Sequence, residues 1–170
     1  MDHRTLIDRE RIAKRVSELA SEISADFASS QLVALVVLKG SMFFAADLLR
    51  EMSMDMEVDV IQVSSYGKEK YSSGVVTILK EPQLDMHGKG VLIIEDIVDS
   101  GYTIREVHRY IESRGASPVK VVSFLDKPAS RKVPFVPDYI GFSIEPHFVV
   151  GYGLDYAEKY RNVPDILVLE

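Results

Sequence analysis

Three predominantly apolar runs constrain the fold of this chain more than any other feature of its sequence. Each has the length of a strand, and the runs are Leu32–Leu38, Val91–Ile94 and Val119–Leu125. A strand that is apolar at successive positions is buried on both faces, as strands of a parallel sheet are. The sequences between the runs include helix-like segments, one of them over residues 42–52 and another ending near residues 114–115. This order of elements predicts right-handed βαβ units and an α/β fold with a mainly parallel central sheet flanked by helices.

Weaker patterns complete the expected topology. Apolar residues from Ile7 to Phe27 recur at nearly helical spacing, which predicts an amphipathic helix close to the N-terminus. Composition assigns the remaining segments: strands over 58–63 and 75–79, a Pro-rich loop over 128–137, and short strands in the tail 139–170. The 170 residues contain no internal repeat and no interdomain linker, so a single domain over residues 1–170 is expected.

The amino-acid composition limits which partners the protein can bind and in which cell compartment it is expected. The chain has no cysteine, which excludes disulfides, thiolate zinc sites and cysteine nucleophiles and is compatible with a reducing compartment. No apolar run approaches the roughly 20 residues of a membrane span, and the first residues lack the apolar stretch of a signal peptide. A formal net charge of −6 argues against nucleic acid, whose phosphates require clustered Lys and Arg. We therefore expect a cytoplasmic protein with no membrane and no nucleic-acid partner.

The segment VLIIEDIVDSGYT, residues 91–103, is the most informative about function. Glu95 and Asp96 follow the second apolar run, which places two charges at the carboxyl edge of the sheet, where α/β proteins bind ligands. The turn from Asp99 to Thr103 combines short hydroxyl side chains, a glycine and a helix start whose N–H groups favour an anion. The glycine spacings of a P-loop and of a dinucleotide fold are absent. The segment predicts a phosphate-binding turn; the alternative is that Asp99 and Ser100 only cap the helix while the acidic pair is solvated.

This segment closely resembles the signature of phosphoribosyltransferases, and Asp at position 99 is characteristic of the hypoxanthine–guanine branch. The resemblance implies that family's fold, including a small hood and a flexible flap. It implies that the acidic pair engages the ribose hydroxyls and that the following turn holds the 5′-phosphate. The expected binding set is Glu95, Asp96, Asp99, Ser100, Gly101, Tyr102 and Thr103. Asp99 is the expected general base, because removing the purine N7 proton makes N9 a better nucleophile.

Other segments match the same family in order along the chain. The resemblance assigns Lys39, Gly40 and Arg161 to pyrophosphate, and Ser65 and Tyr66 to the flap that closes over the reacting centre. Taken alone, Lys39 would be a solvated residue at the end of a strand, and residues 64–74 a solvated loop. These assignments therefore depend on the resemblance.

The purine-binding residues are expected at the third apolar run and in the segment FVVGYGLDY, residues 148–156. The resemblance assigns Lys127 to base reading; its ammonium donates hydrogen bonds but cannot accept them, so it suits the oxygen at purine C6 and disfavours the adenine amino group. The resemblance implies that Phe148 stacks on the base, that the backbone of Val149 meets its edge, and that Asp155 lies near the metal and the base. Alone, Lys127 would be a solvated strand-end residue, and Phe148 would pack in the core.

The resemblance extends over nearly the whole chain and implies purine salvage. The expected reaction transfers the 5-phosphoribosyl group from phosphoribosyl pyrophosphate to a 6-oxopurine, hypoxanthine or guanine, and releases pyrophosphate. Mg²⁺ is the expected cofactor, near Glu95, Asp96 and Asp155, because oxygen ligands suit that ion. A homodimer or homotetramer is expected by analogy. Two alternatives remain open: a regulatory sensor of phosphoribosyl pyrophosphate, which should have a basic face, and a transferase that prefers xanthine.

Overall fold

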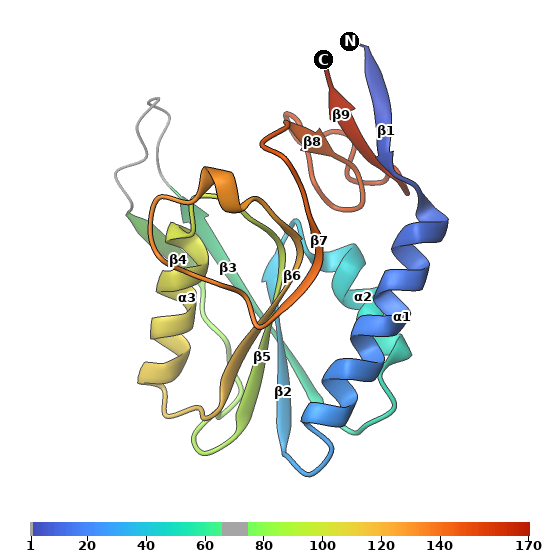
Figure 1. The fold of residues 1–170 in the computed structure, drawn as a ribbon. Helices are drawn as coiled ribbons and strands as arrows, with labels where there is room; N and C mark the ends of the chain where they lie inside the picture. Colours follow the sequence, from blue (N-terminus) through green and yellow to red (C-terminus); the bar gives the residue numbers. More distant parts are fainter. Residues whose placement is uncertain (1, 66–74) are drawn as a thin grey trace.

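Two sheets organise the chain in the computed structural model, which describes residues 2–65 and 75–170 (Figure 1). The larger sheet has six strands in the order β4-β3-β2-β5-β6-β7. Its neighbouring strands from β3 to β7 are parallel, and the edge strand β4 runs antiparallel to β3. The mainly parallel sheet predicted from the apolar runs is confirmed. Its strands are β2 (Leu32–Leu38), β3 (Glu57–Ser65), β4 (Val76–Lys80), β5 (Gly90–Val98), β6 (Val119–Asp126) and β7 (Tyr139–Ser143).

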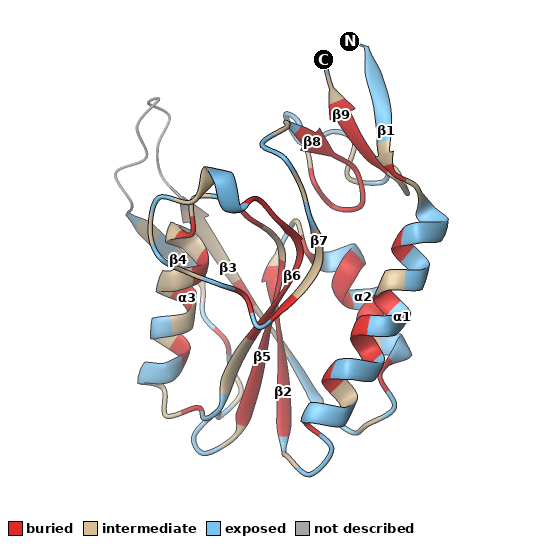
Figure 2. Cartoon of the chain, viewed as in Figure 1, coloured by how far each residue is buried: buried red, intermediate tan, exposed pale blue. Residues whose placement is uncertain are grey.

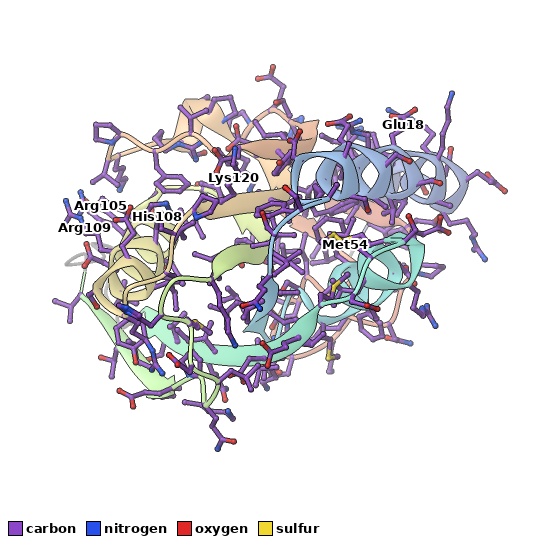
Figure 3. All side chains as sticks on the ribbon, turned by 90° about the horizontal axis from the view of Figure 1, so that it is seen from below. Glu18, Met54, Arg105, His108, Arg109 and Lys120 are labelled. Carbon is purple, nitrogen blue, oxygen red and sulfur yellow. The ribbon has the colours of Figure 1, made fainter. Side chains whose placement is uncertain are left out.

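Helices cover both faces of this sheet. Helices α1 (Arg9–Asp26) and α2 (Met42–Glu51) pack on one face, and α3 (Tyr102–Ser113) packs on the other (Figure 3). Strand β2 shows why its sequence is apolar throughout. Ala34 and Val36 belong to the core cluster beneath α1 and α2, whereas Val33, Leu35 and Val37 belong to the cluster beneath α3. Figure 2 accordingly shows β2 and most of β5 as buried. Each fully buried Val, Leu or Ile side chain of these strands contributes about 1.5–3 kcal/mol by leaving water.

A smaller antiparallel sheet, ordered β1-β9-β8, joins the two ends of the chain. Its strands are β1 (His3–Ile7), β8 (Val149–Val150) and β9 (Ile166–Leu169). We call this sheet, with the connecting residues 151–165, the hood. It lies beyond the carboxyl ends of the parallel strands, and the two termini lie side by side (Figure 1).

The structure corrects the expected start of the first helix. Ile7 belongs to β1, and the helix begins at Arg9, where the Asp8 carboxylate caps it by accepting from the Arg11 N–H at 2.9 Å. The local pattern could not reveal β1, because its partner β9 lies at the other end of the chain. The helix predicted over 42–52 and the strands predicted over 58–63 and 75–79 are confirmed to within two residues. The Pro-rich loop contains a short 3₁₀ turn, η1 (Pro128–Ser130).

The order of the strands places a crevice at one edge of the sheet. From β2 the chain passes through α2 outward to β3, whereas from β5 it passes through α3 outward to β6 in the opposite direction. The loops after β2 and β5 therefore diverge, and in such sheets ligands bind between diverging loops. The hood is anchored beside this edge, because the Tyr152 hydroxyl donates to Asp47 Oδ2 at 2.6 Å. No helix among the described residues is both long enough and apolar enough to cross a membrane.

Candidate active site

A cleft of about 1000 Å³ opens at the carboxyl ends of β2 and β5. Four parts of the main sheet and its loops form its walls, and the hood contributes two further side chains. Its lining includes Leu38 and Gly40 at the end of β2, Ser64 of β3, Glu95, Asp96, Asp99, Ser100, Gly101 and Thr103 of the β5–α3 segment, Ser130, Arg131 and Lys132 at the end of η1, and Asp155 and Arg161 of the hood. The cleft therefore collects most of the residues that the sequence assigned to ribose, phosphate and pyrophosphate.

The acidic pair lies inside β5 rather than at its end. The strand continues to Val98 because β6 pairs with it beyond the carboxylates, with Glu95 opposite Ser123 and Val98 opposite Asp126. This corrects the prediction that the strand ends at the acidic pair. Glu95 is 5% exposed, so the alternative in which the pair is solvated is wrong.

Two adjacent carboxylates in this position are costly to ionise. Burial raises the pKa of Glu95 well above its usual value, and the charge of Asp96 raises it further. Burial also raises the pKa of Asp96, although hydrogen bonds and the positive charge of Arg161 oppose the rise. The Glu95 carboxylate accepts only one protein hydrogen bond among the described residues, from the Asp96 N–H at 3.0 Å. Such a pair is suited to accept hydrogen bonds from ligand hydroxyls or to face a cation.

The turn after β5 leads directly into α3. Gly101 occupies the N-cap position with φ of 90°, a backbone conformation that glycine adopts without penalty, and no side chain caps the helix. The alternative that Asp99 and Ser100 serve as helix caps is therefore wrong. Ser100, Gly101 and Thr103 line the cleft at this helix start, whereas Tyr102 is not among the lining residues. The first N–H groups of a helix form a site for an anion.

The loop after β2 approaches the acidic pair very closely. The peptide bond between Leu38 and Lys39 is cis. A Cβ atom added to Gly40 would lie 1.8 Å from Asp96 Oδ2, and one added to Gly153 of the hood would lie 2.0 Å from the Gly40 carbonyl oxygen. Glycine at both positions therefore allows the hood, the β2 loop and β5 to converge at one point.

The cations assigned to pyrophosphate share one carboxylate. Lys39 Nζ contacts Glu158 Oε2 at 2.9 Å, and Arg161 contacts Glu158 at 3.3 Å and Asp155 at 3.2 Å. The hydrogen bond from Lys39 lowers the pKa of Glu158, and Arg161 lowers it further. Sequence reasoning missed Glu158, because nothing in its local pattern shows that it lies near Lys39.

Of the residues assigned to the purine, Asp155 lines the cleft, whereas Lys127, Phe148 and Val149 are not among its lining residues. Lys127 is 8% exposed, so it is not the solvated strand-end residue of the alternative interpretation. Its Nζ atom lies 3.8 Å from Asp99 Oδ2. Phe148 is 54% exposed and packs edge to face against Tyr156, which excludes the core-packing alternative. Val149 is buried and pairs with Val168.

The expected flap and the expected metal site are the two features for which the structure gives the least information. Ser65 is the last residue of β3, but its side chain lies outside the described residues, as does the whole of Tyr66. Within residues 2–65 and 75–170, no three His, Cys, Asp or Glu side chains form a group that could hold a metal ion. Glu95, Asp96 and Asp155 therefore do not form a three-carboxylate metal site by themselves.

Arg131 is the second residue that sequence reasoning missed. It lines the cleft and donates to the backbone carbonyls of Val98 and Asp99. Its sequence context is a Pro-rich loop, which carries no signal for a role at the site.

Comparison with known proteins agrees with this geometry. The model of the phosphoribosyl transferase domain family matches residues 4–157. The hypoxanthine-guanine phosphoribosyltransferase of Bacillus subtilis is 44% identical over 167 residues, which cover 98% of this chain and 93% of that protein. The bifunctional protein TilS/HprT of Listeria innocua is also 44% identical, but the match covers only 26% of its length.

Solved structures give the same result. A hypoxanthine phosphoribosyltransferase of Staphylococcus aureus superposes with a TM-score of 0.95 at 38% identity, over 98% of this chain and 91% of that one. A hypoxanthine-guanine phosphoribosyltransferase of Bacillus anthracis gives 0.94 at 42% identity, over 98% of both chains. The sheet order, the crevice and these similarities together show that the chain belongs to the phosphoribosyltransferase family.

Proposed function

We propose that this protein is a hypoxanthine-guanine phosphoribosyltransferase, an enzyme of purine salvage that transfers the 5-phosphoribosyl group from phosphoribosyl pyrophosphate to a 6-oxopurine. The observation that carries the proposal is the distance of 3.8 Å between Lys127 Nζ and Asp99 Oδ2. A 6-oxopurine presents an acceptor, O6, next to a donor, the N7–H group. A lysine donor beside a carboxylate acceptor is complementary to that edge, whereas adenine presents an amino group there. The relatives named above support the same substrate class.

The cleft supplies groups for the sugar phosphate. We assign the 5′-phosphate to Ser100, Gly101 and Thr103 with the adjoining backbone of Tyr102, because helix N–H groups favour anions. Glu95 and Asp96 accept hydrogen bonds from the ribose hydroxyls. Pyrophosphate lies toward Lys39, the Gly40 amide and Arg161. When it binds, its charge competes with Glu158 for the two cations.

In the reaction, purine N9 forms a bond to ribose C1′ as the bond from C1′ to the pyrophosphate oxygen breaks. The Asp99 carboxylate accepts the N7 proton, which leaves electron density on the ring for the attack by N9. Lys127 holds O6 and so orients the ring, while Phe148 stacks on one of its faces. Lys39 and Arg161 stabilise the charge that develops on the departing pyrophosphate. Much of the catalysis is therefore positioning and charge stabilisation.

The donor set fits Mg²⁺ as the cofactor. The nearby ligands are carboxylate oxygens, and proteins commonly bind Mg²⁺ through one or two carboxylates together with substrate oxygens and water. The lack of a three-carboxylate group among the described residues is consistent with that arrangement. Asp155 and the pair Glu95 and Asp96 are the residues that would hold the ion. When bound, Mg²⁺ neutralises charge on the pyrophosphate group.

A pyrophosphate-release assay tests the proposal. Purified protein is supplied with phosphoribosyl pyrophosphate, Mg²⁺ and one base at a time: hypoxanthine, guanine, xanthine, adenine or uracil. We expect release with hypoxanthine or guanine, none with adenine or uracil, and loss of release when EDTA removes the metal. Release with xanthine alone would establish the xanthine-preferring alternative. Binding of phosphoribosyl pyrophosphate without release with any base would establish the sensor.

Several features stay predictions. We propose one domain over residues 1–170, supported by the hood contacts at Gly153 and Tyr152. A homodimer or homotetramer, to be measured by light scattering, and a cytoplasmic location, to be measured by cell fractionation, follow from the same family relationship. We assign Ser65 and Tyr66 to a flap that excludes water from the reacting centre.

A further inference from the structure

Arg131 joins two parts of the cleft that are far apart in the sequence. Its guanidinium donates from Nη1 to the carbonyl of Asp99 at 2.8 Å and to that of Val98 at 3.1 Å, and from Nη2 to the carboxylate of Asp126. The Arg131 side chain is 15% exposed and that of Asp126 is 6% exposed. One cation thus holds the turn after β5 and the end of β6 together.

The segment around Arg131 donates hydrogen bonds to the last carbonyl of β5 and to the first two carbonyls of the turn. The Val98 carbonyl also accepts from the Lys127 N–H at 2.9 Å, and the Ser100 carbonyl accepts from the N–H groups of Lys132 at 2.9 Å and Val133 at 3.2 Å. Three consecutive carbonyls, those of residues 98–100, therefore face the segment 127–133.

This arrangement determines where the N–H groups of the turn point. In a planar trans peptide the C=O and the following N–H point in opposite directions. With the carbonyls of residues 98–100 directed at segment 127–133, the N–H groups of residues 99–101 are directed away from it. Consecutive N–H groups that face one side form a concave site for an anion.

The guanidinium also connects the backbone segments that carry Asp99 and Lys127, the two residues proposed to bind the purine edge. Asp99 is the expected base, and Asp126 directly precedes Lys127 in the chain. The aliphatic stem of Arg131 packs over the turn, because a Cβ added to Gly101 would lie 3.0 Å from Arg131 Cδ. Lysine could not replace this contact set, since a single ammonium lacks the planar fork that reaches several acceptors.

We propose that Arg131 is a positioning residue for phosphoribosyl transfer: it holds back the carbonyls of the phosphate turn and so presents the turn's N–H groups to the 5′-phosphate. This inference rests on the proposed function and adds to it a residue outside the family signature segment. Arg131 acts through the turn and does not itself need to touch the substrate.

Kinetics of Arg131→Met test the role, because methionine keeps much of the stem and removes the guanidinium. We expect the KM for phosphoribosyl pyrophosphate to rise about tenfold or more, as expected when hydrogen bonds to a charged group are misaligned, and the KM for hypoxanthine to change less than about threefold. IMP, the nucleotide product formed from hypoxanthine, carries the same 5′-phosphate. Its affinity, measured by calorimetry without turnover, should fall by a similar factor. Arg109→Met is the matched control, because Arg109 lies on the outer surface of α3 and its only ion pair among the described residues is with Glu106 (Figure 3).

Two further variants distinguish whether Arg131 orients the phosphate turn or only neutralises the charge of Asp126. Arg131→Met leaves the buried Asp126 carboxylate unpaired, which can destabilise the whole fold. The double variant Arg131→Met/Asp126→Asn removes that charge, and Arg131→Lys keeps the charge of Arg131 but loses the fork. We expect the double variant to regain melting temperature without regaining affinity for IMP, and Arg131→Lys to melt near wild type with weakened IMP binding.

The outcomes separate this inference from the proposed function. Recovery of both stability and IMP affinity in the double variant would mean that Arg131 only neutralises Asp126, and would overturn the inference. So would a wild-type KM for phosphoribosyl pyrophosphate in Arg131→Met. A wild-type enzyme that releases no pyrophosphate with any 6-oxopurine would instead overturn the proposed function.

Discussion

Gly153 of the hood lies directly against the backbone of Gly40 in the loop after β2, so that a Cβ atom at position 153 would lie 2.0 Å from the Gly40 carbonyl oxygen. This contact joins the C-terminal part of the chain to the cleft. It also brings Arg161, which donates to the Gly153 carbonyl at 2.7 Å, to the side of the cleft where Lys39 lies. The hood is thus part of the site as well as a cover for the core.

The contact predicts a difference between two glycine variants. Gly153 and Gly88 have φ of 101° and 72°, but a Cβ at Gly88 would meet no atom within 4 Å. Both Gly→Ala variants incur about 1–2 kcal/mol from the backbone conformation, and Gly153→Ala adds about 1–3 kcal/mol of overpacking. Gly153→Ala should therefore melt about 2 °C or more below Gly88→Ala in a thermal scan. Equal melting temperatures would show that the hood moves away at no cost.

Asp99→Asn should reduce kcat by about 10²–10⁴, the usual contribution of a general base. The Asp99 side chain is 54% exposed, so melting temperature and affinity for IMP should change little. Steady-state kinetics with hypoxanthine measure the effect, and Asp55→Asn, at an exposed position away from the cleft, serves as the control. Turnover near wild type would remove Asp99 from its assigned role.

Lys127→Met should weaken the discrimination between hypoxanthine and adenine. Loss of a charged donor to O6 corresponds to about 1.5–3 kcal/mol, which is roughly a tenfold or larger rise in KM for hypoxanthine. Adenine has no oxygen at C6, so its weak binding should not fall in parallel. The ratio of kcat/KM for the two bases reports the change, and an unaltered ratio would rule out base reading by Lys127.

The buried acidic pair should lower the stability of the metal-free protein by an amount that depends on pH. Since the pKa of Glu95 is raised in the folded state, its contribution to stability is fully present below the usual value of 4.5 and is lost as the pH rises through the raised pKa. Glu95→Gln should therefore melt about 2–4 °C above wild type near neutral pH in EDTA, and the advantage should disappear in acid. The same variant should lose activity. A constant difference in melting temperature across pH would contradict the expected titration.

Glu158→Gln should strengthen inhibition by pyrophosphate. Glu158 is the carboxylate shared by Lys39 and Arg161, so its neutral variant leaves both cations more available to the product. The Glu158 side chain is exposed, and an effect of about two- to fivefold in the inhibition constant is expected. Glu145→Gln, elsewhere on the surface, is a suitable control, because its side chain makes no ion pair among the described residues. Weaker inhibition would mean that Glu158 organises the two cations for pyrophosphate.

Much of the fold was predictable from local pattern. Strand β2 is apolar throughout because helices cover both of its faces, and this property is visible in seven consecutive residues. Strand β1 was missed, since its stability comes from pairing with β9 at the opposite end of the chain. The extension of β5 beyond Asp96 was missed for a similar reason, because residues of β6 supply the pairing.

The sequence by itself determined the chemistry available to this protein: two adjacent carboxylates after an apolar strand, a hydroxyl-rich turn containing glycine, and isolated lysines after other strands, in the order of a known family. Tertiary structure alone decided which of these groups meet. The approach of Lys127 to Asp99, the sharing of Glu158 by Lys39 and Arg161, and the contacts of Arg131 with the phosphate turn join residues 3 to 119 positions apart. Such contacts depend on how strands are ordered and how the hood closes on them, and a local sequence pattern carries no record of either.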